Sequence, residues 1–332
     1  MESSGDGVKN SAVSDGHPRE EVRVGDEPSG ADLGAGEILD LTDADRNVGG
    51  RAEDAVAVEP GRRGAPARPR STLRSVGLPS EHGGWGLTGE PVLLGLIIAP
   101  SWAGLALGLA AVLAFLARTP TKVALGDLRR GRWMPRTRVA GALAVAEISV
   151  IVALGVFAVT RSPAAIWWPL LVVAPLMALE LAYDIRSRGR RLVPELAGAV
   201  GIAGLATMIV LASSSDLADA VPIAIAVWLV LAARAVTAIP FVRDQVQRMH
   251  DRTPDGPPLV VTDAVAVALV VAAVLLAPEA LAGALAVVVV VALQRVLPAA
   301  GTAVAMGARQ TAMGVAVVVV TACGILLNGG VP

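Results

Sequence analysis

The chain has 332 residues, of which 54% are hydrophobic and only 17% charged, and its formal net charge is −1. Soluble globular proteins usually have about 25% charged residues, so this composition argues against a soluble domain and favours a membrane protein. The single cysteine, Cys323, excludes a disulfide framework within the chain. The small net charge hides an asymmetry, because residues 1–60 hold 15 of the 29 acidic residues and only five basic ones.

The N-terminal part of the chain differs from the rest in composition. Residues 1–78 are rich in Gly, Pro, Ser and charged residues and poor in aromatic ones. Such a segment buries too little apolar surface to offset its ordering entropy. Several arginines between Arg62 and Arg74 precede the first apolar run, and juxtamembrane bases favour the cytoplasmic side and anionic lipid head groups. We therefore predict a disordered cytoplasmic tail over residues 1–78, acidic and then basic, and a membrane domain over residues 79–332.

Apolar runs follow one another closely from Leu87 onward. A helix needs roughly 20 apolar residues to cross the hydrocarbon core, and continuous runs without alternation argue against a membrane barrel. The opening residues have no apolar signal segment, so we expect insertion through the first spans. We predict an all-α fold, a polytopic transmembrane bundle of about nine helices, with its least defined boundary between the first two spans. The predicted spans are residues 84–100, 102–118, 139–160, 164–183, 195–214, 220–240, 259–277, 279–297 and 309–327.

The loops between these spans differ sharply in charge. Counted with the residues at the adjoining span ends, the loops after the even-numbered spans carry 16 lysines and arginines, whereas the opposite loops carry one, Arg161. By the positive-inside rule, the N-terminus is cytoplasmic and, with nine spans, the C-terminus is outside. The high content of Ala, Val, Gly and Arg is typical of a GC-rich bacterial genome, so we expect a bacterial cytoplasmic membrane.

We single out four ionisable residues inside the predicted spans, where each costs several kcal/mol unless paired or hydrated. They are Glu90, Glu147, Glu180 and Arg234, and the predicted orientation places all of them in the cytoplasmic half. Arg234 needs compensation by a carboxylate such as Glu90 or Glu180, or by an anionic ligand. A structural salt bridge and a ligand site therefore remain open as alternatives for Arg234.

A second group of candidates lies at the cytoplasmic ends of the spans. In the segment Pro79–Trp85, PSEHGGW, the His82 side chain can titrate, bind an anion or ligate a metal, or simply form a local hydrogen bond. Residues 241–252 have apolar side chains on one helical face and suggest a short interfacial helix, with a hydrated loop as the alternative. For most of the loop arginines, a topological role alone is the simpler explanation. The candidates at this level are Glu81, His82, Trp85, Arg118, Lys122, Asp127, Tyr183, Arg190, Arg243 and Asp244.

The segment Pro79–Trp85 resembles the P-x-E-H-G-x-W opening of the YwiC-like family of bacterial membrane proteins, and the resemblance covers residues 79 to about 327. That family implies no particular activity. Residues Tyr183, Arg190-Arg191, Pro194, Leu196, Gly198 and Gly201 are more distantly similar to a Tyr…Lys-Arg…Leu-Gly stretch of the UbiA superfamily of prenyltransferases. This second resemblance implies a nine-helix bundle with a cavity that opens toward the cytoplasm.

The chain departs from the UbiA pattern at its metal motifs. In that superfamily, aspartate-rich loops hold magnesium on the substrate diphosphate, and a hard cation needs several oxygen ligands. Here Asp127 is the one acid among seven bases, and Asp244 and Asp251 stand seven residues apart among arginines. Any cofactor therefore stays unknown, with Mg²⁺ as the cation that the resemblance implies, and an enzymatic activity stays uncertain.

Our first hypothesis is a UbiA-like bundle that binds an isoprenoid or lipid phosphate in a cytoplasm-facing cavity. The loop arginines would bind the head group, and Glu81, His82, Glu90 and Arg234 would line the polar neck. If the protein is an enzyme, prenyl transfer is the reaction to test. The alternatives are a proton-coupled transporter, for which we see no internal repeat, and a non-catalytic scaffold. The expected partners are the lipid bilayer and this ligand, with no nucleic acid and an unknown oligomeric state.

Overall fold

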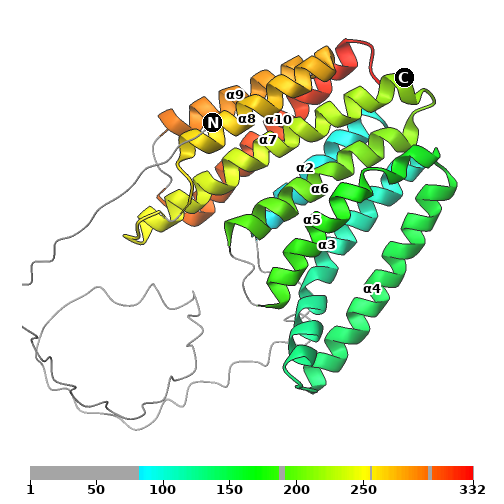
Figure 1. Ribbon diagram of the computed structural model, residues 1–332, viewed down its shortest axis with the longest axis vertical. Coiled ribbons are helices and arrows are strands. Elements are labelled where there is room, and N and C mark those ends of the chain that lie inside the picture. Colours follow the sequence, from blue (N-terminus) through cyan, green and yellow to red (C-terminus); the bar gives the residue numbers. More distant parts are fainter. Residues whose placement is uncertain (1–81, 187–190, 255, 298–300, 332) are drawn as a thin grey trace, which may run out of the picture. The chain divides into compact units, whose positions relative to one another are not determined.

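A computed structural model describes residues 82–186, 191–254, 256–297 and 301–331 of the chain. These residues form nine α-helices and no β-strand (Figure 1), which confirms the predicted all-α fold. Seven of the helices in these ranges are long and apolar enough to cross a membrane. The other two have 17 and 16 residues. The architecture is that of a multi-pass membrane protein.

Each predicted span overlaps one of the observed helices. Short 3-10 turns, Ala164–Trp167 and Pro278–Ala280, precede the fourth and eighth α-helices. The α-helices are α2 (His82–Ile98), α3 (Trp102–Arg129), α4 (Pro135–Thr160), α5 (Leu170–Ile185), α6 (Leu192–Ser213), α7 (Leu217–Met249), α8 (Leu259–Leu276), α9 (Leu281–Val296) and α10 (Ala303–Leu327).

Side-chain caps mark two of the helix boundaries. The Ser101 hydroxyl accepts a hydrogen bond from the Gly104 amide at 2.9 Å and so begins α3. Pro100 has no N–H to donate, so the chain turns between α2 and α3. The carboxylate of Asp216 accepts from the Ala218 amide at 2.9 Å in the same way at the start of α7. The boundary between the first two spans is therefore fixed by local chemistry.

Two helices continue past their predicted ends. Helix α3 continues to Arg129, so Arg118, Lys122 and Asp127 lie on a helix and not in a loop. Helix α7 continues to Met249, so the prediction of a separate short interfacial helix over residues 241–252 was wrong. Charged side chains end an apolar run without ending a helix, because Arg and Lys are good helix formers.

Helix α6 lies at the centre of the packing. It packs against α2, α3, α5 and α7, and its side chains are buried almost continuously from Pro194 to Ala212. Small residues allow close approach: a Cβ at Gly204 would lie within 3 Å of the Trp228 ring of α7. Trp228 also donates its indole N–H to the Val200 carbonyl at 2.8 Å. Helix α4, by contrast, lies at the edge of the bundle beside α3 (Figure 1).

Candidate functional site

A buried polar cluster lies between four helices of the bundle. It comprises Glu90 of α2, Arg234 of α7, Gln294 of α9 and Gln310 of α10, and we call it the inner polar cluster. Arg234 is only 3% exposed. Its Nη2 donates to the Gln310 carbonyl oxygen at 2.7 Å, whereas its Nε and Nη1 have no hydrogen-bond partner among the described residues.

The other members of the inner polar cluster balance this guanidinium only in part. Glu90 is buried, and its charge interacts with that of Arg234. The amide Nε2 of Gln294 donates weakly to Oε1 of Gln310, at 3.4 Å. The remaining side-chain atoms of both amides, Oε1 of Gln294 and Nε2 of Gln310, have no hydrogen-bond partner in the described part of the chain. The inner polar cluster therefore keeps unused hydrogen-bonding capacity, most of it on donor groups.

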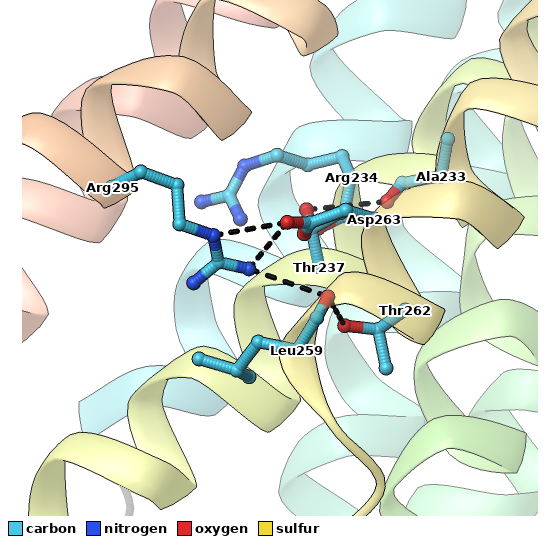
Figure 2. A network of polar contacts seen from close by, with 7 residues as sticks. All are labelled: Ala233, Arg234, Thr237, Leu259, Thr262, Asp263 and Arg295. Atoms are coloured by element: carbon cyan, nitrogen blue, oxygen red, sulfur yellow. Dashed lines mark hydrogen bonds and ion pairs between the residues drawn. The ribbon is translucent and has the colours of Figure 1, made fainter.

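An ion pair lies near this cluster, on α8 and α9. Figure 2 shows Arg295 of α9 reaching Asp263 of α8, with Arg234 and Thr237 of α7 in the same view. The Nε of Arg295 donates to Oδ2 of Asp263 at 2.9 Å. The guanidinium groups of Arg295 and of Arg309 on α10 each lie 5.9 Å from the ring centroid of Phe241, two turns beyond Arg234 on α7. Cationic side chains of three helices thus converge on one region.

A second cluster joins α3 to α5, and we call it the α3–α5 ion-pair cluster. Arg118 donates its Nε to Oδ2 of Asp184 at 2.7 Å and contacts Oε1 of Glu180 through Nη2 at 3.0 Å. Lys122 lies 3.6 Å from the other oxygen of Asp184, which is 2% exposed. The carboxyl group of Glu180 rests directly against Gly198 of α6. The structure therefore brings together three predicted ligand residues, Arg118, Lys122 and Glu180. The two cations of this set contact carboxylates, those of Glu180 and Asp184.

Asp127 stabilises the turn between α3 and α4. Its Oδ2 accepts from the Thr137 hydroxyl at 2.8 Å, and its Oδ1 accepts from Nη2 of Arg136 at 3.2 Å. Both oxygens are engaged within the hairpin, so the observed contacts give Asp127 a structural role.

Two more predicted residues meet at the end of α7. Arg243 contacts Glu195 of α6 at 3.1 Å, and Asp244 pairs with Arg248 one turn later at 2.7 Å. Both line a solvent-open pocket with an empty volume of about 250 Å³, together with Leu192 and other residues at the ends of α6 and α8.

The remaining candidates are spread over other positions. The Trp85 ring packs edge-on against Phe115 of α3 with centroids 5.0 Å apart, and Tyr183 is half-buried on α5. Glu81, Arg190 and the His82 side chain lie outside the described residues.

Sequence reasoning missed Gln294, Gln310 and Asp263. Each is a polar residue inside a predicted span, so the argument applied to Glu90 could have found them. The two amides were overlooked because only ionisable side chains were considered.

The described acids do not fit a two-magnesium site. Asp244 is paired with Arg248, and Asp251 lies on the turn after α7, with a positive φ of 54°. In the described ranges, no three His, Cys, Asp or Glu side chains gather closely enough to hold a metal ion.

The chain was compared with known proteins. No curated protein and no solved structure matches it. The model of the family described as YwiC-like protein matches residues 78–212, a stretch that begins just before the PSEHGGW segment and ends in α6. The predicted YwiC-like resemblance is thereby confirmed over this stretch, while no match shows a relation to UbiA. Residues 78–212 of this multi-helix membrane-type chain are thus YwiC-like.

Proposed function

We propose that this protein binds an amphipathic anion, an isoprenoid or lipid phosphate, whose head group contacts Arg234 in the inner polar cluster. The observation that carries the proposal is the buried guanidinium with two N–H groups that lack partners among the described residues. A buried donor without a partner costs about 1–3 kcal/mol. A bound group that accepts hydrogen bonds from these two N–H groups would therefore be stabilised. It would displace any water that accepts them when the ligand is absent.

The chemistry of Arg234 favours an oxyanion as this ligand. A guanidinium is always charged and matches phosphate and carboxylate oxygens in charge-assisted hydrogen bonds. Glu90 interacts with Arg234 electrostatically, but none of the described hydrogen bonds joins them. The unpartnered Nε2 of Gln310 adds one more donor to the site. A phosphate could accept hydrogen bonds from both residues.

The surroundings support an amphipathic ligand over a free anion. The inner polar cluster lies between helices that are apolar along most of their length, so an isoprenoid or acyl chain has apolar surface to follow. Arg118 and Arg243 already contact carboxylates. Because these arginines near the helix ends are paired with carboxylates, we propose Arg234 as the head-group site in their place.

The proposal includes a location. We infer that the protein lies in a bacterial cytoplasmic membrane, with its N-terminus in the cytoplasm and its C-terminus outside. In this orientation Arg234 lies in the cytoplasmic half of the bilayer. In the same orientation Trp85, in the first turn of α2, would lie at the cytoplasmic end of that helix. Prenyl transfer remains the reaction to assay once binding is established.

Thermal unfolding in detergent tests the proposal, because a ligand that binds only the folded state raises Tm. The probes are a prenyl monophosphate and the matching uncharged prenyl alcohol, added to wild type, Arg234→Gln and Lys122→Gln. We expect the phosphate to raise the Tm of wild type and Lys122→Gln, and to leave that of Arg234→Gln unchanged. An equal shift in Arg234→Gln, or an equal shift with the alcohol, would contradict the proposal.

A further inference from the structure

We propose that Glu147 of α4 is a proton-binding site within the bilayer, separate from the inner polar cluster. Glu147 lies near the midpoint of this 26-residue helix. A helix of that length spans roughly 39 Å at 1.5 Å per residue, more than the hydrocarbon core of about 30 Å. The carboxyl group is therefore far from both ends of a helix that crosses the membrane.

The surroundings of Glu147 are apolar. Helix α4 packs chiefly against α3 and lies at the edge of the bundle (Figure 1). Its buried residues are Thr137 and three alanines, while apolar side chains such as Ile148 and Val150 are about half exposed. In a membrane these exposed side chains contact lipid. Glu147 thus lies between a small-residue helix contact and the lipid phase.

Among the described residues, the Glu147 carboxyl group has no cationic partner. Its Oε2 is buried and forms no hydrogen bond with the described residues. On α3, Arg118 and Lys122 bind Asp184, while Asp127 binds Arg136 of α4. The other charged residues of the α3–α4 pair lie at the helix ends: Arg129 on α3, and Arg138 and Arg161 beside or on α4.

A proton is the ligand that this environment selects. An ionised carboxylate without a partner is very costly in an apolar environment, and protonation removes the charge. Glu90 and Glu180 differ in this respect, because each has an arginine near it, Arg234 and Arg118 respectively. Glu147 has no such neighbour among the described residues and therefore holds its proton.

Labelling with a hydrophobic carbodiimide in lipid vesicles tests this assignment. A protonated carboxyl adds its oxygen to the central carbon of the carbodiimide and transfers its proton to a nitrogen. The O-acylisourea rearranges to a stable N-acylurea, so the protein gains the whole reagent and no group leaves. We expect one label on wild type, mapped to Glu147 by peptide mass spectrometry, and progressively less label as the pH rises.

Variants distinguish Glu147 from the other acids. Glu147→Gln should lose the label, Glu147→Asp should keep it because the carboxyl group remains, and Glu90→Gln should be labelled like wild type. Size-exclusion profiles that match wild type show that each variant is folded. An unlabelled wild type, a label mapped elsewhere, or a label that persists in Glu147→Gln would overturn the proposal. None of these outcomes depends on ligand binding at Arg234.

Discussion

Gly314 of α10 lies directly against the carboxyl group of Glu90 of α2, and a Cβ atom at residue 314 would overlap Glu90 Oε1. The bare backbone of α10 therefore makes the space in which Glu90 is buried and interacts with Arg234. Small residues serve the same purpose in other membrane helix contacts, where they let neighbouring groups approach closely.

The first prediction concerns this contact. Gly314→Ala should displace the Glu90 carboxyl group and lower stability by about 1–3 kcal/mol, as overpacking does. Gly307→Ala on the same helix is the matched control, because no atom lies within 4 Å of a Cβ there, and alanine favours the helix by up to about 1 kcal/mol. Thermal unfolding in detergent measures both. In a Glu90→Ala background Gly314→Ala should cost much less; an undiminished cost would show that Glu90 is not the group displaced.

The second prediction concerns the α3–α5 ion-pair cluster. Arg118→Ala should destabilise the protein by about 3 kcal/mol, because it leaves the buried Asp184 without its closest cation. Lys122→Ala should cost less than about 1 kcal/mol, because Lys122 is 45% exposed and lies 3.6 Å from Asp184. Chemical denaturation of the two variants in mixed micelles compares these costs. Equal losses would mean that Asp184 does not depend on Arg118.

The third prediction concerns orientation. In a Cys323→Ser background, cysteines replace Asn328 after α10 or Arg132 between α3 and α4, both of which are exposed. A membrane-impermeant maleimide should label Asn328→Cys in intact cells and Arg132→Cys only after permeabilisation. The reverse pattern would show that the topology is opposite to the proposed one. Labelling of both variants in intact cells would require an even number of membrane crossings between Arg132 and Asn328.

The apolar runs of the sequence predicted the nine helices well, because each run is long and nearly uninterrupted. They did not predict that α3 and α7 continue to Arg129 and Met249, because membrane burial and helix formation end at different residues. The pairing of Arg118 with Asp184, 66 residues later, depends on how distant helices pack, and no local pattern encodes that packing.

The contact between Glu90 and Gly314 illustrates the same limit. Glu90 was identified as costly inside a membrane, but the glycine that accommodates it lies eight helices later in the chain. Arg234 could be identified as needing compensation, while its hydrogen bond to the Gln310 carbonyl could not. The type of each intramembrane polar residue was readable from the sequence, and its partners were not.

The fourth prediction is a pH dependence of stability. The proposed proton site at Glu147 leads to this prediction, because ionising a carboxyl group that has no partner in an apolar environment costs free energy, so stability should fall as pH rises. Glu147→Gln has no proton to lose at this position and should be less sensitive to rising pH than wild type. Unfolding midpoints measured from acidic to alkaline pH compare the two proteins. Parallel curves would show that Glu147 does not retain a proton on folding.

Native mass spectrometry of the purified protein, followed by identification of the released lipids, tests the central claim most directly. Wild type should retain an isoprenoid or lipid phosphate, and folded Arg234→Gln should lose it while Lys122→Gln keeps it. A wild type that carries only bulk membrane lipids, or an Arg234→Gln variant with the same retained ligand, would contradict the assignment of Arg234 as the head-group site.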